Sequence, residues 1–269
     1  MAYFKYGDKN IYYEETGKGF PLVLLHGNSV SSKMFTGVID LYKDNFKVIL
    51  IDFLGHGNSD RLAQFPVDFW YDQAMQVIEL ITLHHYGSVN LIGTSGGALT
   101  ALNVALERSD LVHKVIADSF EGEQAVSAWT NTISKQREKT KKMEQVCMLW
   151  DYCHGKDWEH VVDLDTDVVI RHEKTIKNFF HKDLSQLTIP AMLSVSLEDD
   201  EYINTIDIEQ TYKDLLKKIP DGTLHLFPSG GHPAMLTNAA KFADLAKDFF
   251  RDYPGITDVS FKHCPNRRI

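Results

Sequence analysis

The segment GTSGG at residues 93–97 has the residue types and spacing of a nucleophile site. It follows the apolar run 89–92 and precedes a helical pattern at 98–107, so Ser95 falls at a strand-to-helix turn. Such a turn strains the serine backbone and directs its hydroxyl outward, and only small residues fit two positions before and after it. Free N–H groups at the start of the helix would stabilise negative charge at the same place. Ser95 is therefore the candidate nucleophile.

Two other glycine motifs do not fit this segment. A dinucleotide-binding fingerprint requires glycine at the position of Ser95, and a phosphate-binding loop requires Gly-Lys-Ser or Gly-Lys-Thr, which occurs nowhere in the sequence. The glycines therefore do not indicate nucleotide binding.

A serine hydroxyl needs a general base and an acid that orients the base, expected here in the order serine, acid, histidine. An apolar run at 191–196 ends in the acidic residues 198–201. A second run at 223–227 leads into His232, which lies on a glycine-flanked loop. Catalytic groups of open α/β sheets gather past the ends of the strands, so His232 is the candidate base, with an acid near residue 200.

The rest of the chain predicts the sheet that these residues require. Residues 4–6 and 11–13 indicate an N-terminal β-hairpin. Short apolar runs, typical of buried strands, occur at 21–25, 46–51, 89–92, 113–117, 191–196 and 223–227. Helical patterns separate them at 32–42, 68–85, 98–107, 209–218 and 239–250. This alternation predicts an α/β fold with a mostly parallel, doubly wound sheet.

Residues 121–182 interrupt the alternation without a convincing strand, and they contain Trp129, Trp150 and Trp158. We interpret this stretch as a helical cap inserted into a single domain that spans residues 1–269. Its large apolar side chains predict either a roof over the substrate pocket or, for most of them, a packed core of the cap itself: Trp129, Met143, Met148, Trp150 and Trp158. The cluster Met148, Leu149 and Trp150 is the most apolar part, so we take Trp150 as the residue expected to face the pocket, with the cap core as the alternative.

Composition narrows the function classes. The net charge is −9 and no long basic cluster is present, which disfavours nucleic acid as a partner. No window is apolar enough to predict a membrane span, and the N-terminus has no signal-peptide pattern. Cys147, Cys153 and Cys264 have neither disulfide nor metal-ligand spacing, so we expect free thiols in a reducing, cytoplasmic compartment. The sequence does not indicate the oligomeric state.

These motifs together resemble the α/β-hydrolase fold superfamily over nearly the whole chain. The matching segments are the oxyanion strand and turn at 22–28, the DFLGHGNSD loop at 52–60, the nucleophile turn at 91–97, the acid strand at 190–200 and the histidine loop at 231–232. The sequence departs from the common pattern at Leu197, where glycine is usual, and at Leu54, where arginine is common.

The resemblance implies a catalytic triad of Ser95, Asp200 and His232, with oxyanion-hole N–H groups from Asn28 and Gly96. The side-chain amide of Asn28 is a further candidate donor. Asp199 is the next candidate for the acid, and Asp118 or Glu121 would serve if the acid follows the preceding strand, as in some relatives.

The resemblance also gives structural roles to two other histidines. His26 is expected to support the oxyanion turn and His56 to order its loop. The His-Gly-Asn turn is similar to that of haloalkane dehalogenases, but those enzymes and epoxide hydrolases use an aspartate nucleophile. Ser95 therefore disfavours both reactions.

The expected function is hydrolysis of a small or medium apolar carboxylic ester through an acyl-enzyme, without a metal or organic cofactor. The same triad supports hydrolysis of a carbon–carbon bond beside a ketone, or a perhydrolase activity. A ligand-binding receptor that kept the fold is the alternative from another class. The expected partner in each case is a small molecule.

Overall fold

The structure, a computed structural model, describes residues 2–251, and Cys264 and the end of the predicted domain lie outside them. One eight-stranded sheet forms the centre of the molecule. Its strands are β1 (Ala2–Tyr6), β2 (Lys9–Gly17), β3 (Phe20–Leu25), β4 (Phe46–Asp52), β5 (Val89–Thr94), β6 (Val112–Asp118), β7 (Ala191–Ser196) and β8 (Gly222–Phe227).

The strand order in the sheet is β1-β2-β4-β3-β5-β6-β7-β8. β1 pairs with β2 and β2 with β4 in antiparallel register, and all the other pairs are parallel. The predicted mostly parallel sheet with an antiparallel N-terminal hairpin is thus confirmed.

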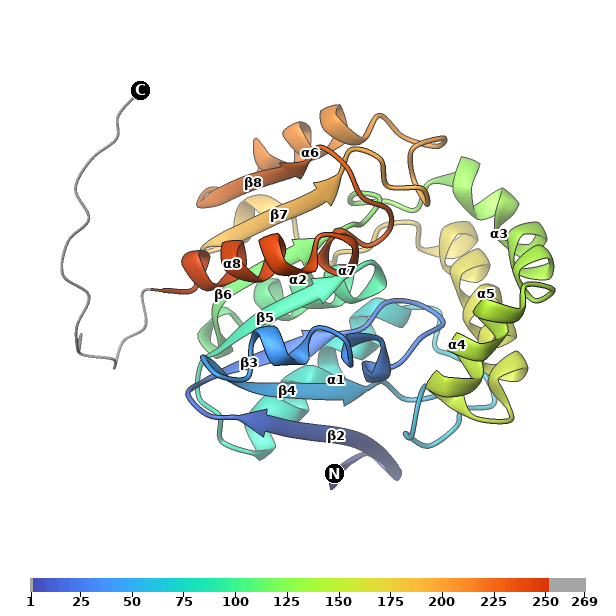
Figure 1. Cartoon of the computed structure of the whole chain (residues 1–269), viewed down its shortest axis with the longest axis horizontal. Coiled ribbons are helices and arrows are strands. Elements are labelled where there is room, and N and C mark those ends of the chain that lie inside the picture. The colour runs from blue at the N-terminus through green and yellow to red at the C-terminus, as the bar shows by residue number, and fades with distance from the viewer. Residues whose placement is uncertain (1, 252–269) are drawn as a thin grey trace.

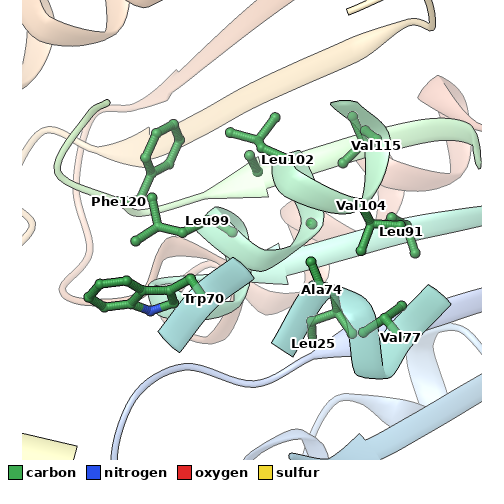
Figure 2. Packing of buried hydrophobic residues seen from close by; sticks show 14 of the residues in the cluster. Leu25, Trp70, Ala74, Val77, Leu91, Leu99, Leu102, Val104, Val115 and Phe120 are labelled. Carbon is green, nitrogen blue, oxygen red and sulfur yellow. The ribbon is translucent and has the colours of Figure 1, made fainter. Parts of the chain in front are cut away.

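Helices cover both faces of the sheet (Figure 1). They are α1 (Phe69–Leu83), α2 (Gly96–Glu107), α3 (Ser127–Thr140), α4 (Glu144–His154), α5 (Trp158–Thr175), α6 (Ile208–Leu216), α7 (Ala234–Thr237) and α8 (Ala239–Phe249). Side chains alternate across a strand, so Leu22 and Leu24 of β3 join the core beneath α8, whereas Val23 and Leu25 join the core beneath α1 and α2. Figure 2 shows Ala74 and Val77 of α1 packed in this second core.

One predicted helix is wrong. Residues 32–42 form two short 3₁₀ helices, Ser32–Phe35 and Ile39–Leu41. The N–H of Ser32 donates to Asp52 Oδ1 at 2.8 Å, which fixes the start of the segment against β4. Gly37 lies between the two 3₁₀ helices, and glycine is unfavourable inside an α-helix. The apolar spacing that suggested one long helix therefore comes from two separate short turns that each pack on the sheet.

The carboxyl ends of the parallel strands meet at one edge of the sheet, and α3, α4 and α5 stand over this edge (Figure 1). These helices lie between β6 and β7, within the stretch 121–182 that we call the cap segment. The two ends of the cap segment lie side by side, since an isolated antiparallel bridge joins Gln124 to Asn178. No helix among residues 2–251 is both long and apolar enough to cross a membrane.

Candidate active site

Ser95 occupies the turn between β5 and α2. Its φ of 57° and ψ of −128° place it in the left-handed half of conformational space, which is rare for a residue with a side chain. Two hydrogen bonds hold this conformation, from Ser95 N to the carbonyl of Asp118 and from Ala98 N to the carbonyl of Ser95, both at 2.8 Å. The strained turn predicted from the glycine spacing is therefore present.

The glycines on either side of Ser95 are required by close packing. A Cβ at Gly93 would lie 2.0 Å from the carbonyl oxygen of Gly97, and a Cβ at Gly97 would lie 2.1 Å from that of Leu25. Gly27 also lies against the turn, since a Cβ there would approach Ser95 Cβ to 3.0 Å. The backbone of the β3 turn and the start of α2 therefore interlock around the serine.

His232 is oriented by Asp199 and not by Asp200. The Nδ1 atom of His232 lies 2.9 Å from Asp199 Oδ2 and 3.1 Å from Asp199 Oδ1, and the Asp199 side chain is fully buried. Asp200 Oδ1 accepts a hydrogen bond from the backbone N–H of His232 at 2.8 Å. The predicted position of the acid is thus corrected by one residue, to the alternative Asp199.

The shift of one residue follows from the turn after β7. Asp199 N donates to the carbonyl of Ser196 at 3.2 Å, so the chain reverses immediately after the strand. This turn directs the Asp199 carboxylate inward, where it also accepts from the N–H of Glu201 at 3.1 Å. Asp200 then points towards the backbone of the histidine loop.

Asp118 and Glu121, the other acid candidates, have different partners. The Asp118 carboxylate accepts from Ser194 Oγ at 2.8 Å and from Met235 N at 2.9 Å, and burial raises its pKa to about 6. Glu121 Oε2 accepts from the Tyr202 hydroxyl at 3.2 Å. Asp118 therefore links β6 to β7 and α7, and Asp199 is the carboxylate paired with the His232 imidazole.

The surroundings of His232 raise its pKa. Burial alone would lower the pKa, but the hydrogen bond and charge of Asp199, helped by Glu201 and Asp118, outweigh burial. The edge of Tyr202 packs against the imidazole, with the ring centres 5.3 Å apart. Among the described residues no hydrogen bond joins Ser95 Oγ to His232, but both side chains line one cavity, and such contacts often tighten only when substrate binds.

A raised pKa predicts the pH dependence of catalysis. The neutral imidazole is the base, so kcat/KM should rise with pH through an apparent pKa above 6.5, the ordinary value for histidine. Replacing Asp199 with asparagine removes the main cause of the shift, so this acid limb should move to lower pH. The measurement is kcat/KM for one ester across pH 5–9. An acid limb that stays in place in the variant would contradict the assignment.

The two predicted oxyanion donors lie together beside Ser95. Gly96 is the first residue of α2, where N–H groups have no acceptor within the helix, and Asn28 lies on the turn after β3. The Asn28 side chain crosses close over Gly96, since a Cβ at residue 96 would lie 2.1 Å from Asn28 Oδ1. Trp70 Nε1 donates to the same Oδ1 at 3.1 Å, so the carbonyl end of the Asn28 amide is occupied.

Known proteins are similar to this chain in sequence. Residues 21–142 match the α/β hydrolase fold family. Human serine hydrolase BPHL is 29% identical over 254 residues, which cover 90% of this chain and 83% of that protein. 2-Hydroxymuconate semialdehyde hydrolase from Pseudomonas sp. strain CF600 is 22% identical, with 88% of this chain and 89% of that protein covered. The chain is a serine hydrolase of the α/β hydrolase fold.

Solved structures agree with this fold. The enol-lactonase of Burkholderia xenovorans LB400 superposes on the hydrolase with a TM-score of 0.72 and 17% identity, over 93% of this chain and 100% of that one. At this level of identity the likeness shows the fold alone.

The cavity at Ser95 has a volume of about 120 Å³. It is lined by aromatic, aliphatic and charged side chains: Asn28, Trp70, Ser95, Gly96, Leu99, Glu121, Trp129, Arg137, Glu201, Tyr202 and His232. The charged groups contrast with the apolar pocket expected from the sequence. Arg137, Glu201 and Tyr202 were not among the lining residues predicted from the sequence. The spacing of Trp129, Ile133 and Arg137 at every fourth residue nevertheless marks one helical face.

A buried polar cluster joins the cap segment to the oxyanion turn. Asp165 of α5 accepts hydrogen bonds from the backbone N–H and the hydroxyl of Ser29, at 2.9 and 2.8 Å, and lies 3.3 Å from His56 Nε2. His154 of α4 accepts from the N–H of Gly57 and contacts the carbonyl of Ser29, each at 3.0 Å. Neither Asp165 nor His154 was among the residues predicted from the sequence.

His26 lies beside this cluster and supports the oxyanion turn. Its Nδ1 lies 2.8 Å from the carbonyl of Gly27, and its Nε2 accepts from the N–H of Phe53 at 3.2 Å. Burial, with the nearby His56, lowers the pKa of His26 to about 3, so the ring stays neutral. The structural roles expected for His26 and His56 agree with these contacts.

The expected place of Trp150 in the pocket is wrong. Its side chain is 2% exposed and stacks on Trp158 with ring centres 5.2 Å apart, and the cavity lining contains Trp129 in its place. Met148 and Leu149 are exposed on the outer side of α4, at 58% and 43%. The helix directs Met148 and Leu149 towards the outside, so Trp150 faces inward and packs inside the cap segment.

Trp150→Ala should therefore act mainly on stability. Truncating a buried tryptophan leaves a cavity and typically costs about 3–5 kcal/mol of unfolding free energy. We expect a clearly lower Tm and a proportional loss of activity on esters of every chain length. The measurements are thermal unfolding and kcat/KM from acetate to octanoate. A changed chain-length preference at unchanged Tm would restore Trp150 to the pocket.

Proposed function

We propose that this serine hydrolase cleaves short-chain carboxylic esters through a covalent acyl-enzyme on Ser95. The observation that carries the proposal is the strained Ser95 turn in one cavity with His232, whose Nδ1 is held by the buried Asp199. His232 accepts the hydroxyl proton as Ser95 Oγ bonds to the ester carbonyl carbon. The N–H groups of Asn28 and Gly96 would bind the oxyanion that forms.

The rest of the cycle uses the same groups. The tetrahedral intermediate collapses, and the alkoxide leaves with the proton that His232 carried. Water then attacks the acyl-enzyme, gives its proton to His232, and releases the acid together with free Ser95. A cavity of about 120 Å³ is small beside the roughly 300–1,000 Å³ of typical small-molecule sites, which favours short acyl groups.

The test is hydrolysis of p-nitrophenyl esters from acetate to octanoate by the purified protein. We expect saturable turnover with the highest kcat/KM at the short end of the series, because the cavity limits the length of the acyl chain. Absence of turnover on every ester, from a folded protein that a fluorophosphonate does not label, would contradict the proposal.

Carbon–carbon bond hydrolysis is the second candidate. It is favoured by the similarity to 2-hydroxymuconate semialdehyde hydrolase, which extends over 88% of this chain. The same serine would attack an aldehyde or ketone carbonyl, the adjacent carbon–carbon bond would break, and the stabilised carbanion that leaves would take a proton. Incubation with 2-hydroxymuconate semialdehyde, followed by chromatography of the products, compares the two reactions directly.

A further inference from the structure

One cation lines the catalytic cavity from the cap side. Arg137 lies on the face of α3 that also carries Trp129 and Ile133, which are 5% and 1% exposed. Both Trp129 and Arg137 line the cavity that contains Ser95 and His232. The inner face of α3 therefore brings a guanidinium group to the substrate side of the site.

The side chain of Arg137 is half-buried, and one of its buried donors has no acceptor within the described residues. Arg137 Nε is buried and has no hydrogen-bond partner, and within residues 2–251 no carboxylate forms an ion pair with the side chain. Its central carbon lies 5.8 Å from the centre of the Trp150 ring, a cation–π contact that supplies no hydrogen-bond acceptor. Arginine has five N–H donors in a planar fork that matches a carboxylate, and a buried donor without a partner is costly.

The acidic groups of the cavity have partners of their own. Glu201 Oε1 accepts from Trp129 Nε1 at 2.6 Å, and Glu121 Oε2 accepts from the hydroxyl of Tyr202. Burial raises the pKa of Glu121 to about 7, so its negative charge is partly lost at neutral pH. Among the charged side chains that line the cavity, the buried donor without a partner is thus Arg137 Nε.

Asp165 explains how the charge is tolerated in the free enzyme. Burial alone would raise the pKa of Asp165, but His56, Arg137 and Ser29 lower it, so Asp165 remains ionised. Its carboxylate oxygens are already bonded to Ser29 and lie near His56. Asp165 therefore balances the charge of Arg137 through space and leaves the N–H groups of the fork for another acceptor.

We propose that Arg137 binds a carboxylate group of the substrate, so that the preferred substrate is a short acyl compound with a second, ionised carboxylate at the end remote from the scissile carbonyl. The proposal rests on the proposed acyl transfer at Ser95, which fixes the position of the carbonyl. The small cavity sets the chain between the two groups to a few carbons. A cationic group at the same end would meet the like charge of Arg137.

The test compares two esters that differ in one charge. Monomethyl glutarate carries a terminal carboxylate, and methyl 4-carbamoylbutanoate carries a neutral amide of nearly the same shape. Release of methanol gives kcat/KM for each. We expect the wild-type enzyme to prefer the anionic ester by about 10- to 100-fold, the range for a charge-assisted hydrogen bond.

Variants of α3 identify the residue responsible. Arg137→Gln should remove most of the preference, and Arg137→Lys should retain part of it, because an ammonium keeps the charge but not the planar fork. Lys135→Gln removes the same charge from an exposed position on the same helix and should leave the ratio unchanged. Thermal unfolding confirms that each variant is folded.

Binding of glutarate, measured by calorimetry, separates this proposal from the catalytic one. Glutarate should bind the wild type, and Arg137→Gln should weaken binding by the same 10- to 100-fold factor. An equal ratio of the two esters in the wild type and Arg137→Gln would overturn the carboxylate site while ester hydrolysis stands. Arg137-dependent glutarate binding without turnover of any ester would support the site and overturn the proposed hydrolysis. If Arg137→Gln does not fold, the wild-type ratio and Arg137→Lys decide the question.

Discussion

Ester hydrolysis by the Ser95→Ala variant is expected to fall by about 10⁴- to 10⁶-fold in kcat, to near the background rate. The substitution removes the only hydroxyl of the turn between β5 and α2 that can form the acyl-enzyme. The backbone hydrogen bonds at Ser95 do not involve the side chain, so the fold should be retained. The measurement is kcat for p-nitrophenyl acetate, with circular dichroism to verify folding.

Ser134→Ala is the matched control, because Ser134 is exposed on α3 and its hydroxyl lies outside the cavity lining. It should retain full activity and full labelling by a fluorophosphonate, whereas Ser95→Ala should not be labelled. Equal labelling of the wild type and Ser95→Ala would show that another residue is the nucleophile.

Asp199→Asn is expected to lower kcat by about 10²- to 10⁴-fold, because asparagine cannot stabilise the imidazolium and favours the wrong tautomer of His232. Asp200→Asn is the neighbouring control. Its side-chain oxygen can still accept the backbone N–H of His232, so we expect only a few-fold loss from a weaker hydrogen bond. The two variants share the loop, the residue type and the loss of one charge.

The comparison of kcat for the two variants, measured on one ester at the pH optimum, tests the assignment of the acid. A larger loss in Asp200→Asn than in Asp199→Asn would reverse it. Equal losses would mean that the loop as a whole, rather than one carboxylate, orients the base.

The buried strands and the nucleophile turn were predictable because they depend on local patterns. Short apolar runs such as residues 191–196 form buried strands. The close packing at Gly93 and Gly97 admits no side chain, so the spacing of these glycines in the sequence is a direct sign of the nucleophile turn. The acid was misplaced by one residue because the turn from Ser196 to Asp199 is set by hydrogen bonds to the carbonyl and the hydroxyl of Ser196, which neither composition nor spacing reveals.

The inner surface of the cap segment was harder to predict for another reason. Three helices can pack over a sheet edge in many rotations, and apolar character alone did not tell the buried Trp150 from the lining Trp129. The role of Asp165 was also hidden, since its partner Ser29 is 136 positions away in the chain. Contacts of this kind depend on tertiary packing, and a single sequence contains no local sign of them.

The contacts of Asp165 and His154 with the turn after β3 limit how new specificities can arise in this hydrolase. Recombination that exchanged the whole cap segment for that of a relative would strip the N–H groups of Ser29 and Gly57 of their buried acceptors. The donor cap would have to supply matching acceptors at both places. A change of specificity by exchange of the whole cap segment is therefore disfavoured in this hydrolase. Stepwise replacement of side chains on the inner face of α3 changes the cavity and leaves the oxyanion turn intact.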